Sequence, residues 1–211
     1  LQSGVTTVND MFCHTRYGED VSLGSVDAIE QLGLRAMVCF GAEDRHGPAP
    51  KNLEVILREH ENLAAHAAAS KRCTFALGIG TVLGQSDALL EESVQLARRN
   101  GWRIHTHLAE VREEKVMARL QWGRSTVEQA AHTGMLDVPV VAGHGIWLSR
   151  SERHLLARQG VAIVHNPQAN MILGSGICNL PALFEAGLTV ALGTDGAASN
   201  DSQNLIEVAK L

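Results

Sequence analysis

The sequence predicts a parallel α/β fold of the (β/α)8 TIM-type barrel class. Seven short apolar runs alternate with helical stretches along the chain. The runs are mostly continuous rather than alternating, as in parallel strands that are covered on both faces. They follow one another at roughly 25–35 residues, which suits βα units. No run is followed by a GxGxxG motif or a P-loop, so a doubly wound open sheet is the second choice.

The composition excludes several classes of protein. The chain has 211 residues, of which 45% are hydrophobic and 19% are charged, as in an ordinary globular domain. The net charge of -5 does not suggest a nucleic-acid-binding protein, which would carry a basic surface. No apolar stretch approaches the roughly 20 residues of a membrane helix. The four cysteines form no CxxC pair, which favours free, buried thiols in a reducing cytoplasm. No linker divides residues 1–211, and we expect one domain.

The first half of the chain carries three of the predicted strands. Residues 5–12 are rich in β-branched and apolar side chains, as strands are. Gly33 and Gly101 lie just past helical stretches, where glycine readily adopts the left-handed cap conformation, and Ser86 is a good N-cap. The expected order is strand 5–12, helix 21–33, strand 35–40, helix 51–70, strand 74–79 and helix 87–100.

The second half carries four more strands. Ser125 and Glu128 form a possible capping box after a break in the helical stretch near 122–123. Asn166-Pro167 is expected to end a strand, and the run 190–192 is expected to be a buried one. The expected order is strand 102–108, helices within 111–134, strand 138–144, helix 149–159, strand 161–165, helix 180–186 and strand 189–195.

Four consecutive strands end in a side chain that can bind a metal or move a proton. These side chains are His107, His144, His165 and Asp195. In a parallel barrel all such ends lie on one face, where the catalytic groups of barrels collect. Imidazole and carboxylate together suit Zn²⁺ or Fe²⁺. We therefore expect one shared site at these strand ends.

The spacing between His107 and Glu110 has a chemical interpretation. His107 can point into the barrel as a ligand, while Glu110 in the loop above can reach a metal-bound water. A metal lowers the pKa of that water towards about 7, and a nearby carboxylate can carry its proton to the leaving group. Glu110 is otherwise an acid that the helix dipole stabilises. His105 faces the same side as His107 and is either a support, which we prefer, or a second ligand.

Other polar residues give weaker signals. Asn170, Ser175 and Gly176 either touch substrate or serve turn chemistry. Ser199 and Asn200 are good caps for the closing helix. Trp102, Trp122 and Trp147 are expected to serve packing. The remaining histidines and one arginine are expected on the surface or in loops: His14, Arg16, His46, His60, His66, His132 and His154.

These motifs resemble the amidohydrolase superfamily. The similarity covers nearly the whole chain and is closest to the branch that holds methylthioadenosine and S-adenosylhomocysteine deaminases, guanine and 8-oxoguanine deaminases and triazine hydrolases. It rests on the combination of several segments, not on one. They are His107-Leu108-Ala109-Glu110, His144, Val164-His165-Asn166-Pro167 with Asn170, Ser175-Gly176 and the segment 192–200.

The resemblance implies a (β/α)8 barrel with one divalent metal, zinc before iron. His107 and Asp195 are similar to the metal ligands of the fifth and eighth strands. Glu110 matches the proton shuttle, and His144 matches the histidine that polarises substrate or orients the hydroxide. The implied reaction is attack of metal-activated hydroxide on a ring carbon of a purine, pterin or related N-heterocycle, with release of ammonia. His165, Asn170 and Ser199 are the candidate substrate contacts.

The chain departs from the family pattern at the first barrel strand. The HxH pair that would supply two further ligands is not found before Val5, and the flanking β-sandwich is also missing. The chain starts at Leu1 without an initiator Met and stops inside an apparent helix, 204–211. We therefore expect a barrel fragment that covers about strands 2–8. Alone, it is expected to bind metal weakly and to have no useful turnover.

Two other functions stay open at this point. One is a triazine-type hydrolase that expels chloride or an alkylamine, and the other is a catalytically inactive barrel kept for binding. The stretch 78–84 lacks the histidine-bearing motif of adenosine-type deaminases, which weighs against a nucleoside. The expected partners are a small heterocyclic substrate and possible copies of the same chain, without nucleic acid or membrane.

Overall fold

The computed structural model describes residues 3–13, 20–45 and 52–211. The chain forms two compact units, Val5–Thr106 and His107–Leu211, each of which is described by itself. Strands and helices alternate along both units, and the strands that pair do so in parallel. The predicted parallel α/β class is confirmed, and a strand lies at each of the seven predicted places.

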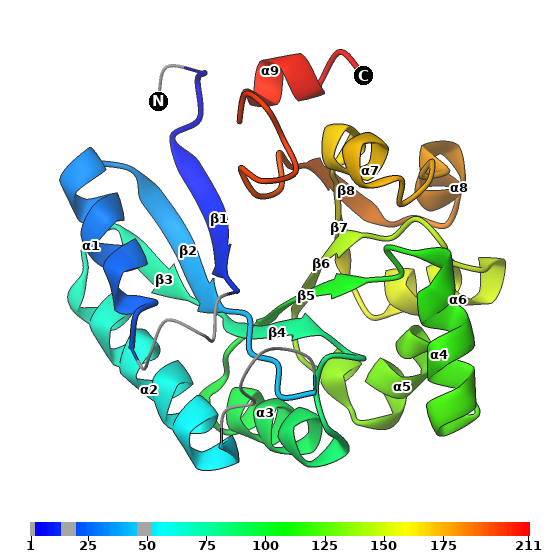
Figure 1. Cartoon of the computed structure of the whole chain (residues 1–211), viewed down its shortest axis with the longest axis horizontal. Coiled ribbons are helices and arrows are strands. Elements are labelled where there is room, and N and C mark those ends of the chain that lie inside the picture. Colours follow the sequence, from blue (N-terminus) through cyan, green and yellow to red (C-terminus); the bar gives the residue numbers. More distant parts are fainter. Residues whose placement is uncertain (1–2, 14–19, 46–51) are drawn as a thin grey trace. The chain divides into compact units, whose positions relative to one another are not determined.

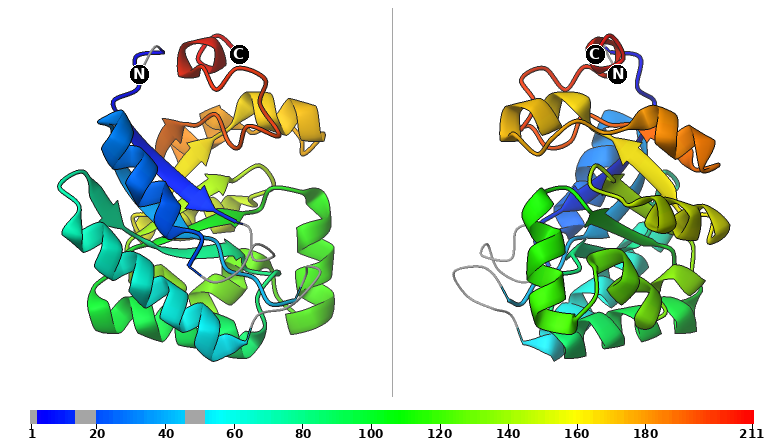
Figure 2. Two further views of the ribbon diagram at one scale, coloured as in Figure 1. Left: turned by 60° about the vertical axis from the view of Figure 1, so that its left-hand side comes forward. Right: turned by 90° about the vertical axis from the view of Figure 1, so that its right-hand side faces the viewer.

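The first unit is built on a parallel sheet in the order β1 (Thr7–Phe12), β2 (Arg35–Phe40) and β3 (Cys73–Phe75). Helices α1 (Leu23–Leu32) and α2 (Leu53–Ala69) lie along this sheet (Figure 2). Their buried side chains share one core with the strands. Burying each large aliphatic side chain contributes about 1.5–3 kcal/mol. The core includes Val26, Val38, Phe40, Ile56 and Leu63.

The predicted strand 74–79 is two strands in the structure. β3 ends at Phe75 and β4 (Leu77–Thr81) starts after Ala76. The backbone changes its hydrogen-bonding neighbour here, because Ala76 N–H donates to Val38 while Leu77 N–H donates to Arg103. A continuous apolar run does not reveal such a change of neighbour, so one strand was the natural prediction.

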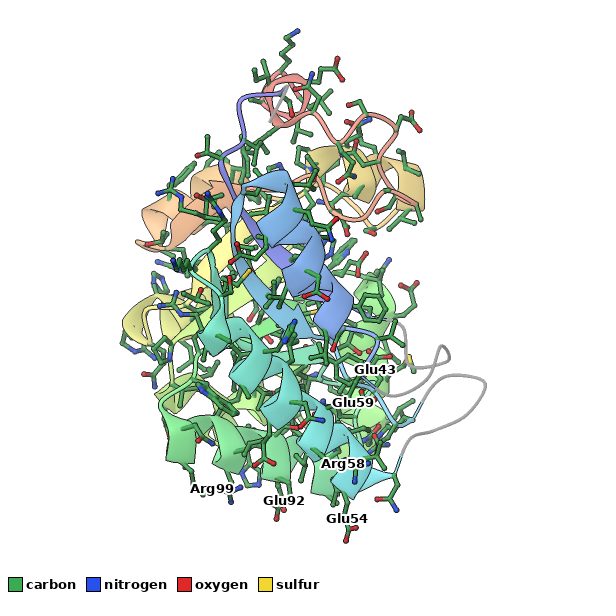
Figure 3. The ribbon with its side chains drawn as sticks, turned by 90° about the vertical axis from the view of Figure 1, so that its left-hand side faces the viewer. Glu43, Glu54, Arg58, Glu59, Glu92 and Arg99 are labelled. Atoms are coloured by element: carbon green, nitrogen blue, oxygen red, sulfur yellow. The ribbon has the colours of Figure 1, made fainter. Side chains whose placement is uncertain are left out.

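Polar and charged residues define the helices of the first unit. Ser86 Oγ accepts the Leu89 N–H at the start of α3 (Asp87–Asn100), and Gly101 ends the helix with φ of 66°, both as predicted. Charged side chains of α2 and α3 project from the outer face, where Glu54, Arg58 and other charged residues are labelled in Figure 3. The opposite faces of these helices are buried and mostly apolar, as amphipathic periodicity predicts, with Glu59 and His60 of α2 and Ser93 of α3 as polar exceptions.

β5, β6, β7 and β8 follow one another in the strand order (Figure 1); β5 begins in the first unit and ends in the second, and the other three strands belong to the second. The β6–β7 and β7–β8 pairs are parallel. The strands are β5 (Ile104–Leu108), β6 (Val140–His144), β7 (Ala162–His165) and β8 (Thr189–Leu192). The helices are α4 (Arg112–Trp122), α5 (Thr126–His132), the 3₁₀ turn η1 (Met135–Asp137), α6 (Arg150–Arg158), α7 (Pro167–Leu173), α8 (Leu180–Glu185) and α9 (Leu205–Val208).

The predicted capping box of Ser125 and Glu128 is present at the start of α5. Ser125 Oγ accepts the Glu128 N–H at 3.2 Å, and the Glu128 carboxylate accepts the Ser125 N–H at 2.7 Å. Gly123 ends α4 with φ of 70°, which explains the predicted break between the two helices. Local chemistry therefore sets these helix boundaries.

Three predictions for the second unit are wrong. The strand predicted at 189–195 with a buried run at 190–192 is shorter and more exposed, since β8 ends at Leu192, which is 41% exposed because β8 lies at the end of the strand order. The segment after β7 was predicted as a loop, but Pro167 is the first residue of α7. Ser199 and Asn200 do not cap α9, since the side chain of Asn204 does so.

Several predicted surface residues lie as expected, and His60 does not. His66 and His132 are surface residues; the ring of His66 pairs with Asp27 at 2.8 Å. His60 is fully buried on α2, between the rings of Phe40 and Phe75 at 5.6 and 6.4 Å between centroids. The helical period places it on the apolar face, which the sequence analysis overlooked. His14, Arg16 and His46 lie outside the described residues.

The cysteines and tryptophans follow the predictions in part. The four cysteines form no disulfide among the described residues; Cys39, Cys73 and Cys178 are buried, whereas Cys13 is exposed. Trp147 is 38% exposed, but its indole packs closely on Gly176 and donates to the Ser175 carbonyl, which fits the predicted packing role.

The buried His60 predicts a pH-dependent stability. Neither ring nitrogen has a hydrogen-bond partner in the described part of the chain, and burial lowers the pKa of His60 to about 3. The unfolded chain, with an ordinary histidine pKa of about 6.5, binds the proton more readily, so stability falls as the pH falls from about 6.5 towards 3. We expect this residue to contribute a slope of up to about 1.4 kcal/mol per pH unit.

Urea unfolding between pH 4 and 7 measures this slope. His60→Leu is expected to flatten it, and His132→Leu, at an exposed histidine, is the matched control. Equal slopes for the wild type and His60→Leu would show that His60 does not carry the effect.

None of the helices in the described ranges has the length and apolarity that crossing a membrane requires.

Candidate active site

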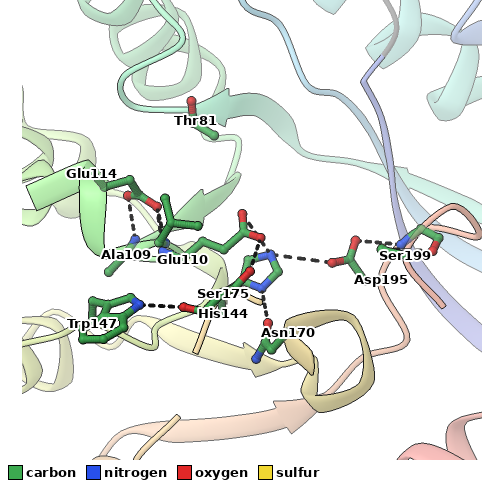
Figure 4. A network of polar contacts seen from close by, with 12 residues as sticks. Thr81, Ala109, Glu110, Glu114, His144, Trp147, Asn170, Ser175, Asp195 and Ser199 are labelled. Atoms are coloured by element: carbon green, nitrogen blue, oxygen red, sulfur yellow. Dashed lines mark hydrogen bonds and ion pairs between the residues drawn. The ribbon is translucent and has the colours of Figure 1, made fainter. Parts of the chain in front are cut away.

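Glu110, His144 and Asp195 converge in the second unit. His144 is the last residue of β6, and Glu110 and Asp195 follow the carboxyl ends of β5 and β8. The Nε2 atom of His144 lies 3.6 Å from Glu110 Oε2 and 3.7 Å from Asp195 Oδ2 (Figure 4). The imidazole is 1% exposed, whereas the two carboxylates are 21% and 19% exposed. The buried ring therefore presents one nitrogen to two carboxylates that solvent or a ligand can reach.

Asn170 holds the other side of the His144 ring. Its Oδ1 lies 2.8 Å from His144 Nδ1, and both residues are buried. Nδ1 donates its hydrogen to this oxygen, because an amide oxygen can only accept, and the ring thereby turns Nε2 towards Glu110 and Asp195. This nitrogen and two carboxylate oxygens thus face one another, an arrangement that a shared proton or a metal cation stabilises.

The carboxylate of Glu110 is held by a hydroxyl. Ser175 Oγ donates to Glu110 Oε1 at 3.1 Å. The backbone of Ser175 is itself fixed, because its carbonyl accepts the indole N–H of Trp147 at 2.7 Å. A substituent at Gly176 would lie 3.0 Å from the Trp147 ring, so the glycine allows this close packing. One carboxylate oxygen is thereby fixed, and the other faces His144.

A tight turn after β8 presents Asp195. Gly193 N–H donates to the carbonyl of His165, and a Cβ at Gly193 would lie 2.3 Å from Asn166 Oδ1. A larger residue would have to displace the side chains of Asn166 and Val164, which glycine avoids. Beyond it, Asp195 Oδ1 accepts the Gly196 N–H at 2.6 Å, which leaves Oδ2 towards His144. The small residues that follow β8 therefore orient one oxygen of the carboxylate.

Backbone strain gathers at this site. Of the five described non-glycine residues with positive φ, three lie here: Ala109 at 52°, His144 at 73° and Asp195 at 63°. Such conformations cost on the order of 1 kcal/mol or more each and persist where the surroundings impose them. They occur at the carboxyl ends of β5, β6 and β8. The backbone here is less stable than a relaxed one would be, but it places the side chains of Glu110, His144 and Asp195 towards one another.

Two further histidines lie beside His144. The ring of His107 stacks on it, with 5.4 Å between centroids and 29° between planes. His165 is buried, and its Nδ1 has no hydrogen-bond partner within the described ranges. Burial first, and the neighbouring His144 second, lower the pKa of His165. His165 is therefore a neutral ring at ordinary pH, available as a hydrogen-bonding group.

The structure places the other predicted residues as follows. Asn170 supports His144 from α7 and is 2% exposed, although its Nδ2 has no partner in the described chain. Ser199 is buried in the turn after β8, where its hydroxyl donates to the Gly196 carbonyl. His105 Nδ1 lies 3.3 Å from Cys39 Sγ within the first unit.

The sequence analysis did not single out Glu114 and Trp147. Glu114 lies in the first turn of α4, where a glutamate that reaches back to the preceding N–H groups is a known signal. Trp147 contacts Ser175 because α7 returns the chain to the site. Pro167, a residue common at the first position of a helix, was the signal in the sequence that could have predicted α7.

The donor chemistry fits a divalent cation. His107 and Asp195 offer an imidazole and a carboxylate, the ligand types that zinc prefers. Across residues 3–13, 20–45 and 52–211, no three His, Cys, Asp or Glu side chains form a group arranged to hold a metal. His107 and Asp195 thus remain two candidate ligands, and the described residues do not supply a complete ligand set.

Imidazoles and carboxylates at or just after the carboxyl ends of parallel strands form the kind of site at which enzymes with (β/α)8 barrels carry their catalytic groups. The chain belongs to the amidohydrolase family, which it matches over residues 1–211. It is 37% identical to a 5-methylthioadenosine/S-adenosylhomocysteine deaminase of Thermococcus sibiricus, covering 100% of this chain and 48% of that protein. The chain thus spans about half the length of the curated relatives it matches.

Solved structures agree with this assignment. An adenosine deaminase of Xanthomonas campestris with bound zinc is 26% identical, with a TM-score of 0.88 over 98% of this chain and 45% of that one. Atrazine chlorohydrolase of Arthrobacter aurescens TC1, complexed with zinc, is 24% identical, with a TM-score of 0.88 over 97% of this chain and 48% of that one. The second likeness supports the fold alone. The barrel class predicted from the sequence is confirmed.

Proposed function

We propose that the full-length protein is a metal-dependent hydrolytic deaminase of a purine, pterin or related N-heterocycle. One observation carries the proposal: the carboxylates of Glu110 and Asp195 both face Nε2 of the buried His144, at 3.6 and 3.7 Å. This cluster can hold and move protons beside a ligand. The name of the T. sibiricus relative adds support for a purine, despite the missing histidine motif at 78–84.

His107 and Asp195 would contribute ligands to the metal. A bound divalent cation would lower the pKa of water towards about 7 and so make a nucleophile at neutral pH. Zinc is the first candidate, since zinc stands in the name of the X. campestris adenosine deaminase structure that this chain resembles. The remaining ligands would come from outside the described residues.

Hydrolytic deamination needs two proton movements that these side chains can serve. As a C–O bond forms at the ring carbon, Glu110 takes a proton from the attacking water and delivers it to the substrate. Asp195 takes the second proton and passes it to the departing nitrogen, so that the C–N bond breaks and ammonia leaves. His144, fixed by Asn170, donates to or orients the oxygen at the reacting carbon.

Two buried polar atoms support binding of a nitrogen heterocycle. His165 Nδ1 and Asn170 Nδ2 have no hydrogen-bond partner in the described chain. An unsatisfied buried polar group costs about 1–3 kcal/mol, which a substrate atom would recover. We propose that they meet ring or exocyclic atoms of the substrate, and that Ser199 shapes the same side of the site.

Ammonia release by the full-length protein tests this function. The panel contains 5-methylthioadenosine, S-adenosylhomocysteine, guanine, a pterin and a triazine. We expect release from a purine or pterin compound. Chloride or alkylamine release from the triazine alone would favour the second type of hydrolase, and no release from any compound would favour an inactive barrel.

A cytoplasmic location and self-association stay predictions.

A further inference from the structure

The carboxylate of Glu114 holds the backbone turn that precedes α4. From the first turn of α4, its carboxylate accepts three consecutive backbone N–H groups, those of Ala109 at 3.0 Å, Glu110 at 2.7 Å and Val111 at 3.2 Å (Figure 4). Val111 is the N-cap of α4 and has no side-chain oxygen of its own. The N–H groups at this helix start therefore depend on Glu114.

The same turn is held from its other side. The carbonyl of Ala109 accepts the N–H groups of Ile146 and Trp147, each at 3.0 Å. Between these contacts, Ala109 adopts φ of 52°, a left-handed conformation that alanine does not favour. We infer that the hydrogen bonds on both sides of the turn maintain this unfavourable backbone conformation.

The location of Glu114 suits this structural task. Burial raises the pKa of its carboxyl, and the backbone N–H donors act in the opposite direction. The neighbouring Glu113 lies in the same helical turn but is exposed. Both carboxylates therefore interact similarly with the helix dipole, but only that of Glu114 accepts the N–H groups of residues 109–111.

We propose that Glu114 is a positioning residue that fixes the turn 109–111 and thereby holds the carboxylate of Glu110 against Ser175 and His144. The inference rests on the proposed function, in which Glu110 carries the proton. Glu114 contacts only the backbone of the turn in the interactions that define this role. A displacement of about 1 Å at a catalytic group can lower turnover by about 10²-fold.

A pair of variants in the full-length protein tests the role. Glu114→Gln removes one charge and leaves one acceptor oxygen, with an amide nitrogen facing the N–H groups. Glu113→Gln removes the same charge from the same turn without touching these N–H groups. We expect kcat of Glu114→Gln to fall about 10- to 100-fold with KM and metal content unchanged, while Glu113→Gln matches the wild type. Glu114→Asp, which keeps the charge but shortens the reach, is expected to lose kcat as well.

Amide hydrogen exchange separates this inference from the proposed function. In the wild type, the N–H groups of 109–111 are expected to be protected, and in Glu114→Gln they exchange at least about 10-fold faster. Full kcat in Glu114→Gln, or unprotected wild-type N–H groups, would overturn the role. A wild type that releases no ammonia would instead overturn the deaminase, while exchange would still decide whether Glu114 holds the turn. If Glu114→Gln does not fold, Glu114→Asp and the wild-type exchange decide it.

Discussion

Glu110→Gln is expected to lower kcat of the full-length protein by about 10²- to 10⁴-fold, the usual contribution of a general acid–base. Glutamine keeps the shape and can still accept the Ser175 hydroxyl hydrogen bond, but it cannot take up a proton. Because Glu110 is not a proposed ligand, metal content is expected to stay at the wild-type value. Steady-state ammonia release with metal analysis of the same sample measures both quantities.

Glu113→Gln is again the control, because it lies three residues away on the surface of the same unit. If Glu110→Gln retained wild-type kcat, the proton-carrying role would be wrong. If it lost metal together with activity, Glu110 would be a ligand and its assignment would change.

Asp195→Asn is expected to lose both metal and turnover. The carboxylate is proposed to bind the cation and to accept a proton, and asparagine does neither well. Metal affinity should fall by more than the roughly 10- to 100-fold that loss of an outer partner costs, and kcat by at least about 10²-fold. Competition with a chromogenic chelator measures the affinity.

Asp201→Asn is the matched control, since Asp201 lies exposed in the same loop. An Asp195→Asn protein that kept its metal and lost only turnover would restrict Asp195 to proton transfer. Unchanged metal and unchanged turnover would remove Asp195 from the site.

Much of the fold could be predicted from the sequence because local chemistry specifies it. Apolar runs mark the strands, and the capping box of Ser125 and Glu128 marks a helix start without any knowledge of the tertiary structure. The exposure of β8 could not be predicted in this way. An apolar run shows what a strand can bury, whereas its place in the strand order decides what it does bury.

The centre of the site was predictable for a similar reason. Parallel strands present their carboxyl ends together, so His144 at the end of β6 and Asp195 in the turn after β8 were expected to lie near each other. The supports were not predictable. Ser175 reaches Glu110 because α7 returns the chain and Trp147 fixes its carbonyl, and these are contacts between segments far apart in sequence.

A zinc titration of ammonia release tests the central claim most directly. Full-length protein is stripped of metal with a chelator, and the rate of ammonia release from its best substrate is followed as Zn²⁺ is added. We expect no release without metal and a rise that levels off near about one equivalent, with Glu110→Gln binding the same zinc and staying inactive. Full release by the metal-free protein, or full activity in Glu110→Gln, would contradict a metal-dependent deaminase built around Glu110, His144 and Asp195.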